Sequence, residues 1–87
     1  MKRWTQIFKA LSNINRVRIV KMLSGRKRLN VSEIAGELDI SPKATSKHLI
    51  ILHNLDVLDS KGKNNRVEYW LNTSLPEDIS KTIKLFI

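Results

Sequence analysis

One short stretch near the middle of the chain, SPKATSKHL, gathers side chains that could bind a polyanion. On a helix over residues 42–54, one stripe of the surface would collect Lys43, Ser46, Lys47 and Ile50, at the spacing i, i+3, i+4 and i+7. Lysine ammonium groups can donate to guanine edges, and serine hydroxyls can bond base edges or phosphates. The stripe therefore suits a groove of double-stranded DNA, and a solvated basic helix face is the alternative.

The histidines and the missing residue types argue against a chemical role. His48 and His53 are five residues apart, a helical spacing that puts the two rings on different faces. The chain has no cysteine, which excludes disulfides, thiolate metal sites and cysteine nucleophiles. Neither a converging acid pair nor a phosphate-cradling glycine loop is evident. The sequence predicts no enzyme, no metal site and no cofactor.

Composition and charge agree with a polyanionic partner. The chain of 87 residues is long enough for one domain, which we place at residues 1–87. Lys and Arg number 16 against 8 Asp and Glu, a formal net charge of +8 that favours DNA, RNA or an anionic membrane surface. No apolar run approaches the ~20 residues that span a bilayer, and the first residues lack a secretion-signal pattern. We therefore expect a cytoplasmic protein without a membrane partner.

The elements that would position the central stripe begin with two helices. Apolar residues recur with helical spacing over 4–11 and again over 14–23. Ser12 or Asn13 could cap the second of these helices, because both side chains accept hydrogen bonds from a first helical turn. Residues 29–31 then form a short β-like run.

Two more helices follow, joined by a tight turn. Ser32 is expected to cap a brief helix that ends near Leu38. Ser41 is a favourable N-cap and Pro42 a favourable first residue, so a fourth helix starts there and continues to Leu55. The turn between the two helices gives a helix-turn-helix arrangement.

Beyond the fourth helix the apolar period changes from about 3.6 to 2. Residues 57–61 and 66–71 are typical of two strands, and the Gly and Asn residues of 62–65 suit a hairpin turn. Ser74 and Glu77 have capping-box spacing and predict a last helix. The sequence thus predicts a mainly α (α+β) fold, a winged helix-turn-helix with a two-stranded β-wing. Helix 42–54, the second helix of the helix-turn-helix, would enter the major groove.

With these elements in place, the chain resembles the ArsR/SmtB family of winged-helix transcriptional repressors. The similarity is carried by FKALSNINRVRIVKML, VSEIAGELDISPKATSKHLIILHNLDVL and GKNNRVEYWLN. Metal-sensing members have cysteines where this chain has Asn30 and Ser32, and the predicted last helix has no histidine. Asp56 replaces the usual glycine after the recognition helix, at a left-handed position that Asp tolerates. The resemblance implies a DNA-binding scaffold and leaves any effector unknown.

One face of the fourth helix, with Leu49 and Leu52 and with Ile51 beside it, is expected to pack against the body. The expected DNA contacts lie on its opposite face and on the wing. Arg16 and Arg18 could also reach flanking phosphates, and the resemblance suggests a phosphate contact for His48. The wing would lie along the DNA backbone or the minor groove, where lysines anchor rather than specify. The predicted DNA-binding residues are Ser41, Pro42, Lys43, Thr45, Ser46, Lys47, His48, Lys61, Lys63, Asn64, Asn65 and Arg66.

Two apolar stripes at the chain ends exceed what the central core needs, which favours a homodimer built by N- and C-terminal dimerisation helices. The resemblance implies the same, since the first and last helices build the family's two-fold dimer. The predicted interface residues are Trp4, Ile7, Phe8, Leu11, Ile79, Ile83, Phe86 and Ile87.

Three functions remain open on the sequence alone. The first is a regulator, most simply a repressor, that binds a pseudo-palindromic operator through helix 42–54 and wing 59–68. The second is an architectural protein that coats DNA without sequence preference. The third is a winged helix that binds another protein, in which case the basic stripe would be idle.

Overall fold

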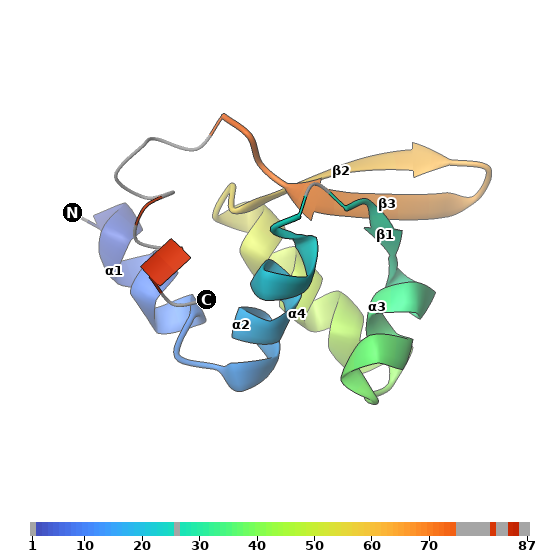
Figure 1. The fold of residues 1–87 in the computed structure, drawn as a ribbon, viewed down its shortest axis with the longest axis horizontal. Coiled ribbons are helices and arrows are strands. Elements are labelled where there is room, and N and C mark those ends of the chain that lie inside the picture. Colours follow the sequence, from blue (N-terminus) through green and yellow to red (C-terminus); the bar gives the residue numbers. More distant parts are fainter. Residues whose placement is uncertain (1, 26, 75–80, 82–83, 86–87) are drawn as a thin grey trace.

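The computed structural model describes residues 2–25, 27–74, 81 and 84–85 (Figure 1). Helices form the body of the molecule, and a long hairpin extends from it as a wing (Figure 1). The predicted winged helix-turn-helix is confirmed. In chain order the elements are α1 (Lys2–Ala10), α2 (Ile14–Leu23), β1 (Leu29–Asn30), α3 (Val31–Leu38), α4 (Pro42–Asn54), β2 (Leu58–Lys63) and β3 (Arg66–Leu71).

Polar caps decide where α2 and α3 begin. Asn13, not Ser12, caps α2, because its side chain accepts two backbone N–H groups of the first turn. Asn30 caps α3 in a reciprocal capping box, in which the Glu33 carboxylate accepts the Asn30 N–H at 3.0 Å. The prediction that Ser32 caps this helix was wrong, because the helix has already begun one residue earlier.

The boundaries of α4 follow the prediction. The Ser41 hydroxyl accepts the Ala44 N–H at 3.1 Å, and Pro42 occupies the first helical turn. Asp39 ends α3 in a left-handed conformation with φ 57°, and Asp56 follows α4 with φ 60°. These two aspartates supply the sharp reversals that Gly more often supplies, so α4 is fixed at both ends.

The hydrophobic core packs α4 against the other helices and the start of β2. Leu49 and Leu52 are fully buried there, as predicted. Ile7 and Leu11 of the N-terminal segment are only 0% and 4% exposed and belong to the same core. Their assignment to a dimer interface was wrong, because an apolar stripe does not reveal whether its own chain or a partner covers it. Ile51, expected beside the packed face, is instead 40% exposed.

The wing belongs to a three-stranded antiparallel sheet with the order β1-β3-β2. The pairing of Lys63 with Arg66 leaves a turn of only two residues, Asn64 and Asn65, with φ 51° and 64°. Two consecutive residues with positive φ are typical of a type I′ hairpin turn, whose backbone twist matches that of the flanking strands. The predicted turn at 62–65 was therefore too long, since β2 continues through Gly62.

Several predictions fall beyond this description. The last helix, predicted from Ser74 onward, lies almost wholly outside the described residues, and the side chains of Trp4 and Lys63 are outside them as well. Among the helices that are described, none has the length and apolar character needed to cross a membrane. The predicted interface residues outside the description are Ile79, Ile83, Phe86 and Ile87.

Candidate nucleic-acid interface

The outer face of α4 carries the predicted groove-reading residues. Lys43 and Lys47 are exposed, Ser46 is half-buried, and both lysines are without ion pairs among the residues that the structure describes. The opposite face of α4 is held in the core, so this surface has a fixed orientation. We call the following set the recognition stripe: Pro42, Lys43, Ser46, Lys47 and Ile50.

Thr45 does not belong to this surface. Its side chain is 0% exposed, and its hydroxyl donates to the Ser41 carbonyl at 2.9 Å. The prediction of a DNA contact from Thr45 was therefore wrong. A burial signal was present in the sequence, because Thr45 shares a helix face with Leu49 and Leu52 at the spacing i, i+4 and i+7.

His48 lies at the border between α4 and the body. Its Nδ1 atom is 3.2 Å from Nη1 of Arg16, which reaches it from α2. Partial burial and the Arg16 guanidinium lower the pKa of His48 below its ordinary value of 6.5, because both disfavour the imidazolium. The ring is therefore a neutral hydrogen-bonding group at neutral pH.

The two arginines of α2 bind the ends of other helices. Nε of Arg16 donates to the Ala10 carbonyl at 2.6 Å, in the last turn of α1. Arg18 donates to the carbonyls of Glu37 and Leu38 at 3.2 and 3.4 Å, in the last turn of α3. Guanidinium groups at helix C-termini satisfy free carbonyls and oppose the negative end of the helix dipole. The sequence predicts phosphate contacts for these arginines, and no local pattern indicates the role at helix ends that the structure shows.

The tip of the wing presents polar and cationic side chains to solvent. Lys61, Asn64, Asn65 and Arg66 are all exposed, and they come from two paired strands and the turn between them. At the base of the same sheet, the Arg28 guanidinium stacks 4.2 Å from the centre of the Trp70 ring. The wing thus offers groups that could follow a phosphate backbone.

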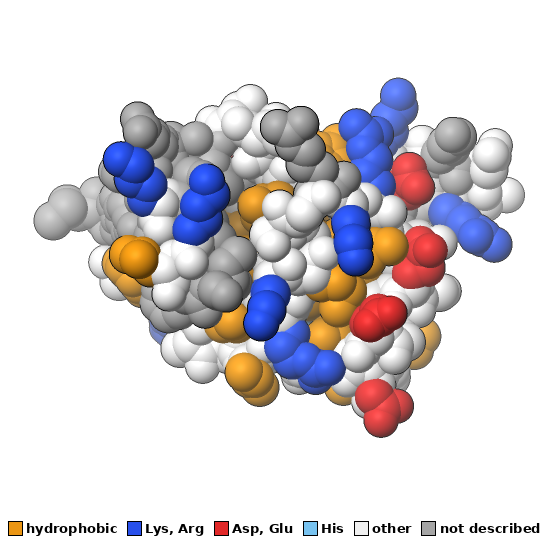
Figure 2. Space-filling view, viewed as in Figure 1, with side chains coloured by type: hydrophobic (Ala, Val, Ile, Leu, Met, Phe, Trp, Pro, Cys, Tyr) orange, Lys and Arg blue, Asp and Glu red, His pale blue; other side chains and the backbone are white. Residues whose placement is uncertain are grey.

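The two helices of the helix-turn-helix differ in charge. α3 carries Glu33 and Glu37 and is followed by Asp39, all three exposed, and it contains no Lys or Arg. α4 carries Lys43 and Lys47 and contains no acid. In Figure 2, acidic side chains gather on the side of the molecule that holds α3. Repulsion would keep the exposed face of α3 away from a polyanion, which helps orient the recognition stripe toward it.

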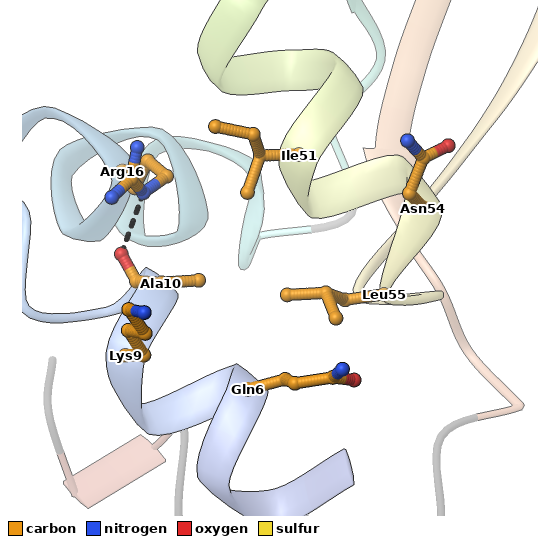
Figure 3. A pocket seen from close by; sticks show the side chains of 7 residues that line it. All are labelled: Gln6, Lys9, Ala10, Arg16, Ile51, Asn54 and Leu55. Atoms are coloured by element: carbon orange, nitrogen blue, oxygen red, sulfur yellow. Dashed lines mark hydrogen bonds between the residues drawn. The ribbon is translucent and has the colours of Figure 1, made fainter. Parts of the chain in front are cut away.

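A cavity of about 400 Å³ opens between α1, α2 and α4. Figure 3 shows Ile51 of α4 and Leu55, which follows α4, on one side and the Arg16–Ala10 hydrogen bond on the other. Beside this cavity, Arg16 connects α1 with α4, because it donates to the Ala10 carbonyl and contacts His48. The lining residues are Gln6, Lys9, Ala10, Arg16, Ile51, Asn54 and Leu55.

Of the predicted dimer residues with described side chains, Phe8 remains at the surface and is 45% exposed. The described residues contain no group of three or more His, Cys, Asp or Glu that could hold a metal ion. The family's cysteine positions are occupied here by the helix-capping Asn30 and by Ser32, which is exposed in the first turn of α3.

Comparison with known proteins places this geometry in a family. Residues 13–60 match the model of the bacterial regulatory proteins of the arsR family. The transcriptional repressor SdpR of Bacillus subtilis is 33% identical over 72 residues, which cover 83% of this chain and 79% of SdpR. The cadmium resistance transcriptional regulatory protein CadC of Listeria innocua is 41% identical over 64 residues, 74% of this chain but only 54% of CadC.

A solved structure supports the same assignment. HlyU from Vibrio cholerae superposes with a TM-score of 0.82 at 26% identity, over 97% of this chain and 87% of HlyU. The chain belongs to the arsR family, and the resemblance inferred from its sequence is confirmed. It is a DNA-binding transcriptional regulator and not an enzyme, as the sequence predicted.

Proposed function

We propose that this chain represses transcription by binding a pseudo-palindromic operator in duplex DNA as a homodimer. The observation that carries the proposal is the recognition stripe itself. It is an exposed cationic face on a helix that is capped at its start and buried along its opposite side. A helix presented in this way fits the major groove, where base pairs are distinguishable by their donor and acceptor patterns.

Within the major groove, Lys43 and Lys47 would donate to guanine O6 or N7, and Ser46 would bond a base edge or a phosphate. Ile50 is 54% exposed and would pack on a thymine methyl or a deoxyribose. Ser41 and Pro42, at the start of α4, would lie closest to the backbone, where a helix N-terminus favours a phosphate.

Phosphates on either side of the groove would be bound by His48 and by the wing. The wing contacts anchor the protein without reading sequence, because phosphates are the same at every position. The proposed wing residues are Lys61, Lys63, Asn64, Asn65 and Arg66.

A homodimer would place two recognition helices about one DNA turn (~34 Å) or a multiple apart, which matches a pseudo-palindrome. The exposed Phe8 on α1 supports an interface there. We propose that Trp4, Ile79, Ile83, Phe86 and Ile87 complete it, within a single cytoplasmic domain of residues 1–87.

Repression is favoured over activation because SdpR, one third identical, is named a transcriptional repressor. Cadmium sensing does not carry over from CadC by similarity alone. This chain has no cysteine, and Asn30 is already used as a helix cap.

Selection of duplexes from random DNA by the wild-type protein tests the proposal. We expect a two-fold-symmetric consensus, a discrete footprint, and affinity that falls steeply with salt. A continuous footprint with no consensus would instead indicate DNA coating. A cellular function that is unchanged when Lys43, Ser46 and Lys47 are all replaced by Ala would instead indicate a protein-interaction module.

A further inference from the structure

One side chain, Arg16, connects three helices. It belongs to α2, bonds the Ala10 carbonyl at the end of α1 through Nε, and contacts Nδ1 of His48 on α4 through Nη1. The distances are 2.6 and 3.2 Å. A planar guanidinium held at two points has little freedom to rotate, so the imidazole that it contacts is held as well.

The direction of the hydrogen bond fixes the proton on the imidazole. A guanidinium has only donors, so Nδ1 of His48 must accept. A neutral imidazole that accepts at Nδ1 carries its proton on Nε2, at the far side of the ring. The ring therefore offers one N–H donor with a defined direction.

We propose that Arg16 is a positioning residue, which holds His48 in the Nε2–H tautomer so that this N–H can donate to a DNA phosphate. The inference rests on the proposed function, because it assigns the partner of His48 as a phosphate. Arg16 itself does not touch the DNA in this account. It acts by orienting His48. Its hydrogen bond to the Ala10 carbonyl fixes its own position at the end of α1.

Burial and the neighbouring guanidinium agree with this assignment, since together they lower the pKa of His48 and keep the ring neutral. Of the charged groups that the structure describes, Arg16 is the one in contact with the ring. A neutral donor releases no condensed counterion. His48 would therefore add affinity without adding to the salt dependence of binding, unlike a lysine bound to the same phosphate.

The first test uses the free protein, so that it does not depend on DNA binding. Long-range ¹H–¹⁵N correlation spectra would report the tautomer and the pKa of His48 in the wild type, Arg16→Met and Arg16→Lys. We expect the Nε2–H tautomer in the wild type. In Arg16→Met, both tautomers should be populated and the pKa should rise toward 6.5, with burial still lowering it. Arg16→Lys should restore the charge but not the single tautomer, because an ammonium lacks the planar fork.

The second test measures affinity for the duplex that the wild type selects from random DNA. His48→Ala and Arg16→Met should each weaken binding about tenfold, as expected for a hydrogen bond to a charged group. The double variant should bind no more weakly than the weaker single variant. His48→Gln, whose amide can donate from a similar position, should keep most of the affinity. The salt dependence should be unchanged in all four.

Thermal unfolding of each variant checks that it is folded. If Arg16→Met does not fold, the comparison of His48→Gln with His48→Ala still decides whether an N–H donor is needed. A proton on Nδ1 in the wild type would overturn the proposal, as would equal affinity of His48→Ala and wild type, or a double variant whose loss is the product of the two single losses. Failure of the recognition stripe is a separate result, shown by unchanged affinity after Lys43→Ala and Lys47→Ala.

Discussion

Helices α2 and α4 each contain a pair of cationic side chains close together, and the fold uses the two pairs in opposite ways. Arg16 and Arg18 of α2 turn toward the ends of α1 and α3 and donate to backbone carbonyls. Lys43 and Lys47 of α4 are exposed beside a buried apolar face. The arginines hold the scaffold together, while the lysines remain available to a ligand.

The chemistry of the two side chains explains this division. A guanidinium presents several donors in one plane and can bond two acceptors at once, whereas an ammonium is a compact and strongly hydrated charge on a flexible stem. The formal charge of +8 therefore includes two arginines whose donors are already used within the fold. What decides the role of a basic residue here is whether a helix end lies within its reach.

The largest effect is expected when the polar side chains of the recognition stripe are removed. Replacing Lys43, Ser46 and Lys47 together with Ala should weaken binding to the selected duplex by at least about 100-fold, because each base contact is worth roughly 1–3 kcal/mol. The free energy of unfolding should change little, since these side chains contribute nothing to the core. Fluorescence anisotropy and urea unfolding on the same preparations measure both. Loss of stability comparable to the loss of binding would contradict the division of roles.

The converse change removes the scaffold cation. Arg18→Met keeps an apolar stem but leaves the carbonyls of Glu37 and Leu38 without this donor. We expect the free energy of unfolding to fall by about 1 kcal/mol, a modest value because these bonds are partly exposed to water. Affinity for DNA, measured at a temperature where the variant is fully folded, should stay within about twofold of the wild type. A tenfold loss of affinity with unchanged stability would instead make Arg18 a phosphate contact.

An effect of similar size is expected at the start of the recognition helix. Ser41→Ala removes the hydroxyl that accepts the Ala44 N–H, and loss of such a cap typically costs about 1 kcal/mol of stability. Ser32→Ala is the matched control, because Ser32 is exposed and does not cap α3, and we expect a change within about 0.5 kcal/mol. Equal losses in the two variants, measured by chemical unfolding, would show that the assigned caps are wrong.

The smallest expected effect lies at the wing. Arg66→Ala should weaken binding a few-fold for selected and scrambled duplexes alike. The slope of log K against log salt should fall by about 0.9, the value for one phosphate contact. Asp59→Asn, on the neighbouring strand, is the control, because it changes the net charge by one and leaves every Lys and Arg in place. A loss confined to the selected duplex would mean that the wing reads sequence.

The parts of the fold that sequence predicts best are those set by local chemistry. Ser41 followed by Pro42 marks the start of α4, and the left-handed position of Asp56 is a single-residue preference. The cap of α3 is harder to predict, because Asn30, which has capping-box spacing to Glu33, also lies in the short strand that precedes the helix.

The site was harder to predict because its details depend on tertiary contacts. Thr45 was offered to DNA for its hydroxyl, yet the core buries it. The contact between Arg16 and His48 joins residues 32 positions apart, and no local pattern indicates it. Periodicity finds which side chains share a face, and only the packed structure shows what covers that face.

Whether α4 reads DNA sequence is tested by comparing two duplexes of equal length, the selected sequence and a scrambled copy, at two salt concentrations. For the wild type, we expect binding to the selected duplex at least about 1,000-fold tighter than to the scrambled one. In Lys43→Ala/Lys47→Ala, the affinity for the selected duplex should fall much more than the affinity for the scrambled duplex. The ratio of the two affinities should therefore decrease. Equal affinity of the wild type for both duplexes, or an unchanged ratio in the variant, would contradict the assignment of sequence reading to α4.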